Sequence, residues 1–371
     1  MTMLSRRQML IGAGALVGAG MTPGTTLFRA AFGEDIARPD YMIRAGTNEN
    51  PWGPSRVALR AMADSFRSAS LYGGNKRELA KILASINNVP TDHVTIGSGS
   101  REILRTAGML AYMDHGSVVA ADPTYHDLIR YAEQAGSKII RVPVEPETLH
   151  IDLNAMHKAI RPDTRCVYLV NPNNPIPSII EKNALRDFVR DVAKRCMVFV
   201  DEAYFEYVDN PNYASMMDLV RNGQQNLIVS RTASKIHGLA GMRIGFGFAH
   251  PDLIQRIDAA KTGSINVMGV NGAIASYRDD EFQNFTLRKN RESVAIVQHM
   301  VDDLGLRHVK SNANFAFFHT GHDIREVRQA FRQENIMVGR PFPPMMDWLR
   351  VSMAKPHEME YFVQVYQRLF G

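Results

Sequence analysis

Residues 229–243 of this chain read Val-Ser-Arg-Thr-Ala-Ser-Lys-Ile-His-Gly-Leu-Ala-Gly-Met-Arg. Lys235 stands among hydroxyl side chains and is followed by two glycine turns, with Arg243 eight positions after the lysine. This layout suits a Schiff base between the lysine amine and an aldehyde cofactor, while Thr232, Ser234 and Arg243 hold a phosphate of that cofactor. A Ser-Lys pair alone is weak evidence, because most lysines are merely solvated, so the assignment depends on the motifs around it.

Two further motifs lie upstream of this lysine, each at the end of an apolar stretch. In 200–204, Val-Asp-Glu-Ala-Tyr, the carboxylate of Asp201 can pair with a protonated pyridine nitrogen and keep the ring an electron sink. Tyr204 can donate to a phenolic oxygen of the same ring. In 171–175, Asn-Pro-Asn-Asn-Pro, a rigid turn orients Asn174 toward that oxygen, although a proline-rich β-turn without a function has the same pattern.

Two more segments favour a phosphate site and a stacking platform. Residues 97–101, Gly-Ser-Gly-Ser-Arg, lie between an expected strand and an expected helix, where N–H groups at Ser100 and Arg101 can cradle a phosphate. A glycine–serine loop by itself is weak evidence for such a site. In 122–125, Asp-Pro-Thr-Tyr, Tyr125 either stacks on an aromatic ring or packs as a half-buried tyrosine.

Apolar, β-branched stretches alternate with helical patterns from residue 93 onward. Continuous apolar strands between helices are typical of a mostly parallel sheet covered on both faces, which binds ligands at the carboxyl ends of its strands. The sequence therefore predicts an α/β fold: a large domain with a mostly parallel seven-stranded sheet, and a smaller α/β domain. The expected strands of the large domain are 93–97, 117–120, 138–142, 166–170, 197–200, 227–230 and 243–248. The expected helices are 102–113, 125–135, 154–160, 183–195, 281–303 and 358–369, with weaker strand patterns at 314–319 and 336–339.

Taken in their order, these motifs resemble those of the fold type I pyridoxal-phosphate-dependent aminotransferases, and in particular the histidinol-phosphate aminotransferase family. The resemblance covers nearly the whole chain after residue 33. It includes Asn-Glu-Asn-Pro-Trp-Gly-Pro-Ser at 48–55 and Arg-Val-Ser at 350–352. It implies an enzyme that uses pyridoxal 5'-phosphate to move an amino group between an amino acid or amine and a keto acid. The domains expected are a large cofactor-binding domain at 71–268 and a small domain formed by 34–70 and 269–371.

The resemblance also implies a role for each matching residue. Lys235 forms the Schiff base, Asp201 binds the pyridine nitrogen, and these two with Tyr204 are the catalytic residues. The other cofactor contacts that it implies are Asn174 and Tyr204 at the phenolic oxygen, Tyr125 on the ring, Ser100, Arg101, Thr232, Ser234 and Arg243 at the phosphate, and Tyr72, supplied to the phosphate across a homodimer interface.

Three residues are expected to contact the substrate. The resemblance implies that Arg350 holds the α-carboxylate through a two-pronged contact, and that Arg340 lies by the substrate side chain or carboxylate. Asn50, with Glu49, either closes over the substrate or belongs to an ordinary turn. The stiff loop 340–346 is expected to line the side-chain pocket.

The sequence departs from the family pattern at a few positions. Ile176 and Pro177 replace a Thr-Gly pair, Arg101 stands where an aspartate is common, and His237 where an aromatic residue is usual. The substrate therefore stays open, and another reaction on the same fold, by a decarboxylase, lyase or oxidase, is an alternative. A binding protein without catalysis is disfavoured, because Lys235 and Asp201 are both present.

Composition excludes several other classes of protein. The chain has 371 residues, 45% of them hydrophobic, and a formal net charge of +5 that is spread along the sequence. We expect small-molecule substrates, no nucleic acid, no metal and no stable membrane span. The two cysteines, Cys166 and Cys196, cannot form a disulfide framework and are expected to be buried core thiols.

The first 33 residues are expected to be a targeting signal. Ser5-Arg6-Arg7 precedes an apolar, glycine- and alanine-rich stretch at 11–21, which is the pattern of a twin-arginine signal peptide. A chance basic N-terminus and an uncleaved anchor are the alternatives. The sequence thus predicts a periplasmic protein exported by the twin-arginine pathway.

Overall fold

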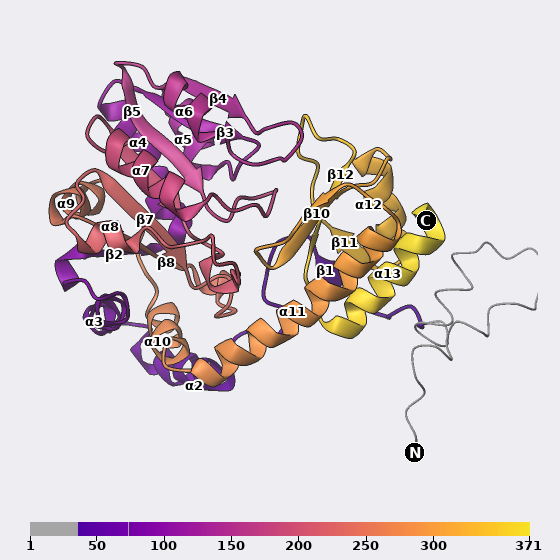
Figure 1. The fold of residues 1–371 in the computed structure, drawn as a ribbon. Coiled ribbons are helices and arrows are strands. Elements are labelled where there is room, and N and C mark those ends of the chain that lie inside the picture. Colours follow the sequence, from indigo (N-terminus) through magenta and orange to yellow (C-terminus); the bar gives the residue numbers. More distant parts are fainter. Residues whose placement is uncertain (1–35, 73) are drawn as a thin grey trace, which may run out of the picture.

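The computed structural model describes residues 36–72 and 74–371, which form a large and a small α/β domain (Figure 1). The expected signal at 1–33 lies outside the described residues. In the part of the chain that is described, no helix is long and apolar enough to cross a membrane.

A seven-stranded sheet forms the centre of the large domain, in the order β2-β8-β7-β6-β5-β3-β4. Pairs among β3, β4, β5, β6 and β7 are parallel, whereas β8 runs antiparallel to both β2 and β7. The expected mostly parallel seven-stranded sheet is thus confirmed. Its strands are β2 Val94–Ser98, β3 Ser117–Asp122, β4 Ile139–Pro143, β5 Thr164–Val170, β6 Met197–Asp201, β7 Leu227–Thr232 and β8 Ile244–Ala249.

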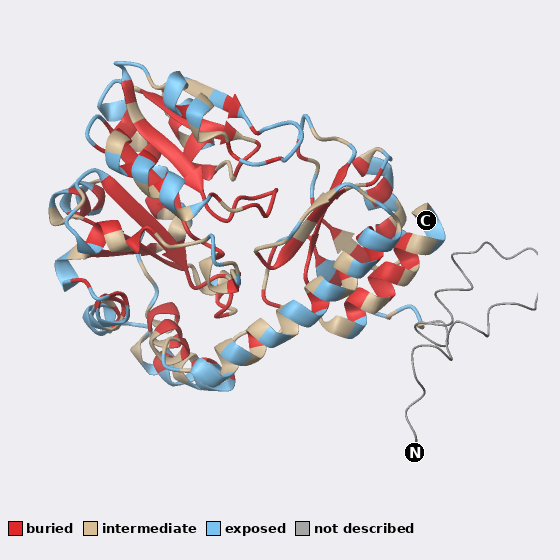
Figure 2. Ribbon diagram, viewed as in Figure 1, coloured by how far each residue is buried: buried red, intermediate tan, exposed pale blue. Residues whose placement is uncertain are grey.

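Helices cover both faces of this sheet, which explains why its strands are apolar throughout (Figure 2). Alternate residues of each strand enter different cores: Val167 and Val198 pack with α3, α6 and α7, whereas Cys166 and Phe199 pack with α4, α5 and α9. The helices are α3 Lys76–Asn87, α4 Ser100–Met113, α5 Asp127–Ala135, α6 Leu153–Ala159, α7 Lys182–Val192, α8 Met217–Arg221 and α9 Pro251–Ala260. Both cysteines are free and buried, as expected.

The small domain combines two short sheets with three helices. The antiparallel sheet has the order β12-β10-β9, and β1 pairs in parallel with β11. The elements are β1 Ile43–Ala45, β9 His308–Val309, β10 Phe315–His319, β11 Ile336–Val338, β12 Trp348–Ser352, α11 Asp280–Asp303, α12 Ile324–Gln333 and α13 Pro356–Phe370. Phe331 and Phe362 stack at 4.9 Å in its core.

The segment before the main sheet divides between the two parts of the molecule. β1 joins the small domain, whereas α2 Arg56–Asp64 packs against α10 Val267–Ser276, beside α3 (Figure 1). α11 begins next to this helical group and runs into the small domain. Short 3-10 helices complete the chain at η1 Ser65–Ser68, η2 Thr91–His93, η3 Phe205–Tyr207 and η4 Ala240–Met242.

Candidate active site

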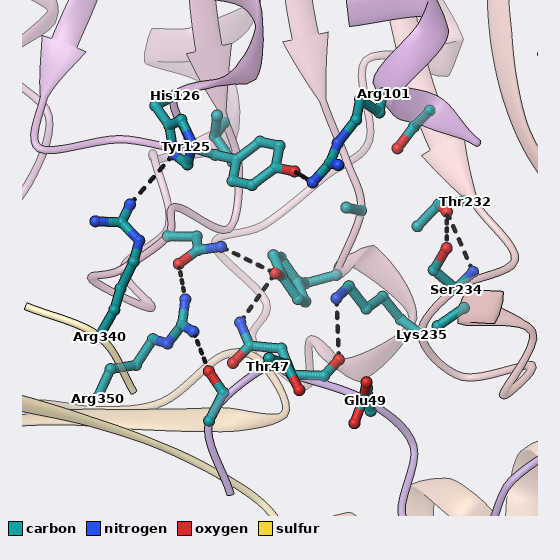
Figure 3. A pocket seen from close by; sticks show the side chains of 18 of the residues that line it. Thr47, Glu49, Arg101, Tyr125, His126, Thr232, Ser234, Lys235, Arg340 and Arg350 are labelled. Carbon is teal, nitrogen blue, oxygen red and sulfur yellow. Dashed lines mark hydrogen bonds between the residues drawn. The ribbon is translucent and has the colours of Figure 1, made fainter. Parts of the chain in front are cut away.

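A cavity of about 460 Å³ lies between the carboxyl ends of the central strands and the small domain (Figure 3). Because parallel strands end at one edge of a sheet, motifs that are far apart in the sequence meet there. The structure brings twelve of the expected site residues into the wall of this cavity: Ser100, Arg101, Tyr125, Asn174, Asp201, Tyr204, Thr232, Ser234, Lys235, Arg243, Arg340 and Arg350.

Lys235 extends into the cavity from the loop after β7. Its Nζ donates to the backbone carbonyl oxygen of Asn48 at 3.0 Å and lies 5.4 Å from the centre of the Tyr204 ring. Asn48 has a φ of 54°, a left-handed conformation that asparagine tolerates better than most residues. The amine is therefore held in the cavity by a neutral acceptor rather than by a carboxylate.

Asp201 is the last residue of β6 and is only 2% exposed. Burial raises the pKa of its carboxyl to about 6, while a hydrogen bond from Ser230 and the charge of Lys235 oppose that rise. The Ser230 hydroxyl donates to Oδ1 at 2.7 Å. A carboxylate that lacks a cationic partner in such a place would be stabilised by a protonated ring nitrogen.

The phenol of Tyr204 is fixed by two side-chain amides. Asn48 Nδ2 and Asn174 Nδ2 donate to its oxygen at 3.0 and 3.1 Å. Both lone pairs are thereby used, so the phenolic proton is free to be donated to a group in the cavity.

An anion cradle forms where α4 begins. Its free N–H groups carry partial positive charge, and the hydroxyls of Thr232 and Ser234 and the Arg243 guanidinium surround the same place. Two glycines permit this packing: a Cβ on Gly99, whose φ is 77°, would collide with Arg243, and one on Gly245 would collide with the backbone nitrogen of Ser100.

Arg243 itself is a cation without a counter-ion in the described chain. Its Nη1 donates to the carbonyl oxygen of Ala240 at 2.7 Å, and no carboxylate among the described residues pairs with it. Burial, followed by the charge of Arg101, lowers its pKa. An incoming phosphate would relieve both effects.

Tyr125 is held in place by a buried carboxylate. Its hydroxyl and Nε of Arg101 both donate to Oδ2 of Asp127 at 2.5 Å, and burial followed by the charge of Asp127 raises the tyrosine pKa. The departure at Arg101 is thus accounted for, because its side chain neutralises Asp127 and steadies the ring. Asp127, the first residue of α5, was not among the expected site residues, because an acidic residue at a helix start has an ordinary role there.

Arg350, from β12, reaches the cavity from the small domain and is 8% exposed. It donates to Oδ1 of Asn174 and to the carbonyl oxygen of Gly46, both at 2.6 Å, while its Nε has no partner among the described residues. Burial lowers its pKa to about 10. A buried guanidinium with neutral partners and a spare donor is suited to binding a carboxylate.

Two expected residues lie outside the cavity wall of this chain. Asn50 donates to the carbonyl oxygen of Ile236 and accepts from the backbone of Trp52, while its neighbours Asn48 and Glu49 line the cavity. Tyr72 is fully exposed on the surface. Nothing in the sequence distinguished Asn48 from Asn50, since both stand in the same motif.

His237, which stands where the family usually has an aromatic residue, packs in the interior of the protein. Its ring lies 4.0 Å from that of Tyr277, and Nδ1 pairs with the Ser276 hydroxyl at 2.9 Å. Burial lowers its pKa to about 3, so it is neutral. It does not line the cavity.

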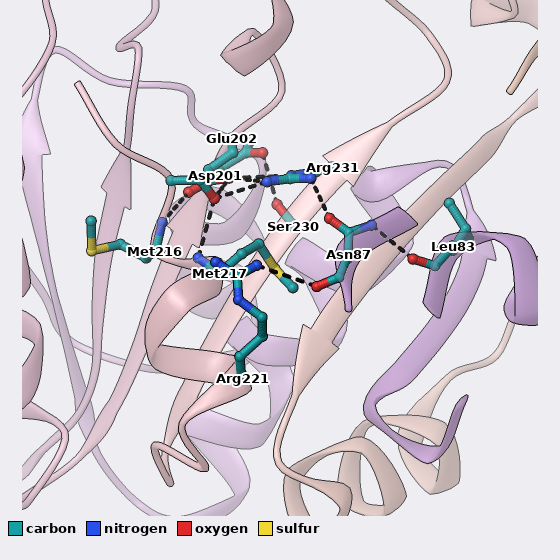
Figure 4. A network of polar contacts seen from close by, with 10 residues as sticks. Leu83, Asn87, Asp201, Glu202, Met216, Met217, Arg221, Ser230 and Arg231 are labelled. Carbon is teal, nitrogen blue, oxygen red and sulfur yellow. Dashed lines mark hydrogen bonds and ion pairs between the residues drawn. The ribbon is translucent and has the colours of Figure 1, made fainter. Parts of the chain in front are cut away.

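A buried ion pair supports the floor of the site (Figure 4). Arg231 contacts Glu202 at 3.0 Å, and its Nη1 donates to Oδ1 of Asn87, the last residue of α3. Glu202 follows Asp201 directly, so this pair ties the end of β6 to a helix from the N-terminal part of the chain.

These groups together match pyridoxal 5'-phosphate. The anion cradle would hold its phosphate, Tyr125 its ring, Asp201 its nitrogen, Tyr204 and Asn174 its phenolic oxygen, and Lys235 its aldehyde carbon. Among the described residues, no group of three His, Cys, Asp or Glu side chains is placed to hold a metal ion.

Comparison with known proteins agrees with this geometry. The family model for aminotransferase class I and II matches residues 41–365. A histidinol-phosphate aminotransferase from Moorella thermoacetica is 34% identical over 336 residues, which cover 89% of this chain and 86% of that protein.

Two solved structures share the fold. One, from Erwinia carotovora atroseptica and provisionally named histidinol-phosphate aminotransferase, has a TM-score of 0.84 and 32% identity, covering 89% of this chain and 96% of its own. The histidinol-phosphate aminotransferase of Sinorhizobium meliloti, in complex with pyridoxal-5'-phosphate, has a TM-score of 0.80 and 24% identity, covering 100% of this chain and 98% of its own. From its family match and its site, the chain belongs to the aminotransferase class I and II family and is a pyridoxal-phosphate-dependent aminotransferase.

Proposed function

We propose that this aminotransferase acts on an amino donor that carries an anionic group at its far end, and returns the amino group to a keto acid. The observation that carries the proposal is Arg340, an arginine of the cavity wall that belongs, like Arg350, to the small domain. Arg340 lies at the rim, and no carboxylate among the described residues pairs with it or with Arg350. The relatives named for histidinol phosphate, an anionic amino compound, support this substrate class.

Four residues of the cavity have separate roles in the proposed reaction: Asp201, Tyr204, Lys235 and Arg350. When bound, the cofactor withdraws electrons from the carbon that carries the amino group. Asp201 would keep the ring nitrogen protonated, and the Tyr204 hydroxyl would donate a hydrogen bond to the phenolic oxygen. Arg350 fixes a carboxylate, and Lys235 Nζ takes the proton from the amino-bearing carbon as a general base and later returns one as a general acid.

A panel of amino donors tests this function. The holoenzyme is mixed with phosphorylated amines, dicarboxylic amino acids and neutral amino acids, and the change in cofactor absorbance and the release of CO2 are recorded. We expect the anionic donors to convert the cofactor to its amine form at lower concentration than neutral donors, with no CO2. Release of CO2 would instead indicate the decarboxylase alternative.

We also propose that the active unit is a homodimer in which Tyr72 completes the neighbouring site. The support is the exposure of large apolar side chains on the segment that holds Tyr72 and on the helices before and after it: Val57, Leu59, Phe66, Leu71 and Ile86. A second copy of the chain would cover such side chains.

We further propose that the protein is exported to the periplasm by the twin-arginine pathway after it binds its cofactor. The support is the Ser5-Arg6-Arg7 motif and the apolar stretch that follows, together with a cofactor that is made inside the cell. Fractionation of cells that express wild type or Arg6→Lys/Arg7→Lys tests this. Wild type should appear in the periplasm with bound cofactor and the variant in the cytoplasm; wild type confined to the cytoplasm would contradict export.

A further inference from the structure

A histidine of the large domain contacts an arginine of the small domain across the mouth of the cavity. His126 is the residue before α5, and Arg340 follows β11 closely. Nη2 of Arg340 lies 3.2 Å from Nδ1 of His126, and both side chains line the cavity (Figure 3).

The chemistry of this contact fixes the protonation of His126. A guanidinium has donors only, so Nδ1 must accept, and the ring must be neutral with its proton on Nε2. The other groups in direct contact with Arg340 are neutral as well: Nη1 donates to the carbonyl oxygen of Pro341 at 2.9 Å, and the Phe342 ring lies 4.3 Å from Cζ. Its charge also acts on Arg350, which is a cation like Arg340 itself. The guanidinium is therefore oriented without being neutralised.

We propose that His126 is a positioning and specificity-determining residue, whose neutral imidazole holds Arg340 in place to bind the far anionic group of the substrate. This inference rests on the proposed function, which supplies that anionic group. His126 makes no capping hydrogen bond to α5, so its side chain has no role in starting the helix.

The surroundings of His126 keep it neutral. Burial is the largest effect that lowers its pKa, followed by the charges of Arg340, Arg130 and Arg101, while Asp127 alone opposes them. Tyr125, at a ring distance of 5.5 Å, is uncharged near neutral pH because its own pKa is raised.

The sign of the pH effect follows from this. Above its lowered pKa the imidazole accepts from Arg340, and the contact is intact. Below that pKa, protonation removes the acceptor and places two cations side by side. Affinity for a second anionic group should therefore fall as the pH is lowered, whereas affinity for a single carboxylate at Arg350 should change less.

Binding of two simple acids to the holoenzyme tests the proposal without turnover. Glutarate has two carboxylates and pentanoate has one, and their dissociation constants are measured from cofactor absorbance between about pH 5.5 and 8. The ratio of the two constants reports the second anionic contact. His126→Phe removes the acceptor, His126→Asn keeps an acceptor that does not titrate, and His150→Phe, at an exposed position, is the matched control.

We expect wild type and His150→Phe to prefer glutarate, with a preference that weakens in acid. In His126→Phe the preference for glutarate over pentanoate should be about tenfold smaller at pH 8, which is the value of one hydrogen bond to a charged group. His126→Asn should keep most of the preference for glutarate and should show less weakening of it in acid than wild type does.

Arg340→Gln separates the two claims. If it loses the preference while His126→Phe keeps it, the role of His126 is wrong and the proposed function stands. If wild type has no preference, or Arg340→Gln retains it, the anionic subsite of the proposed function is wrong. The same acid dependence in His126→Asn as in wild type would also overturn the role of His126.

Discussion

The side-chain oxygen of Asn174 accepts a hydrogen bond from Arg350 at 2.6 Å, which joins the large domain to the small domain at the centre of the site. The amide nitrogen of the same asparagine donates to Tyr204. One side chain therefore orients both the phenol that is expected to contact the cofactor and the guanidinium that is expected to bind the substrate. The two hydrogen bonds of Asn174 therefore fix the position of Arg350 relative to Tyr204.

Replacing Arg350 tests its role in binding the substrate carboxylate. Arg350→Lys keeps a charge but cannot make a two-pronged contact. We expect KM for an α-amino acid to rise by about tenfold, with a smaller effect on kcat. An amino donor without an α-carboxylate is the control, and an equal rise in KM for both donors would argue against this role.

We expect the Asp201 carboxylate to raise activity and to lower the stability of the folded apoprotein. Since burial raises its pKa to about 6, the folded apoprotein binds a proton between about pH 4 and 6 that the unfolded chain has released. This group therefore costs stability as pH rises through that range, and the cost is complete above pH 6. Asp201→Asn should remove it, raising the free energy of unfolding of the apoprotein at pH 7.5 by at most about 3 kcal/mol.

The measurement is urea unfolding of both apoproteins at pH 4 and 7.5, together with kcat of the holoenzymes. The gain in the free energy of unfolding of Asp201→Asn should vanish near pH 4. The kcat of this variant should fall about a thousandfold or more, which corresponds to several kcal/mol of activation free energy, because the ring nitrogen loses its charge partner. An unchanged kcat would remove Asp201 from the mechanism.

The anion cradle depends on close backbone packing at Gly245. In Gly245→Ala the new Cβ would strike the Ser100 backbone and displace the start of α4. We expect the free energy of unfolding to fall by about 1–3 kcal/mol, and cofactor affinity to fall with it. Gly241→Ala is the matched control, because nothing lies within 4 Å of a Cβ there. Titration with cofactor checks this, and equal affinity in the two variants would be inconsistent with the assignment of the cradle.

A shared site predicts complementation between inactive chains. Mixing Lys235→Ala with Tyr72→Ala should restore up to about a quarter of wild-type activity, since half of the dimers are mixed and each has one intact site. Mixing Lys235→Ala with Arg350→Ala should restore nothing, because both residues belong to the same site of one chain. Full activity of a monomer at low concentration would contradict the dimer.

Much of the large domain could be predicted from the sequence, because each strand is buried on both faces and reads as a continuous apolar stretch. β6 was expected at 197–200 and spans Met197–Asp201, and β7 was expected at 227–230 and spans Leu227–Thr232. The antiparallel direction of β8 was not readable, since direction depends on the connection and not on the apolar pattern.

Long-range pairings were the part that the sequence could not reveal. β1 has three residues and pairs with β11 almost three hundred positions away, which leaves no periodicity to detect. The contacts of Asn48 with Tyr204 and Lys235, and of His126 with Arg340, arise in the same way. The motifs indicated which side chains take part in the reaction. The contacts that orient those side chains arise from the packing of the two domains.

The central claim is that Lys235 carries the cofactor, and borohydride reduction of the holoenzyme followed by peptide mapping tests it most directly. Reduction makes the bond between the lysine and the cofactor permanent. The account predicts a single modified peptide that contains Lys235, and no modification or cofactor absorbance of the bound form in Lys235→Ala. Modification at another lysine, such as Lys261, whose Nζ donates a hydrogen bond to the carbonyl oxygen of Ile96, would contradict it.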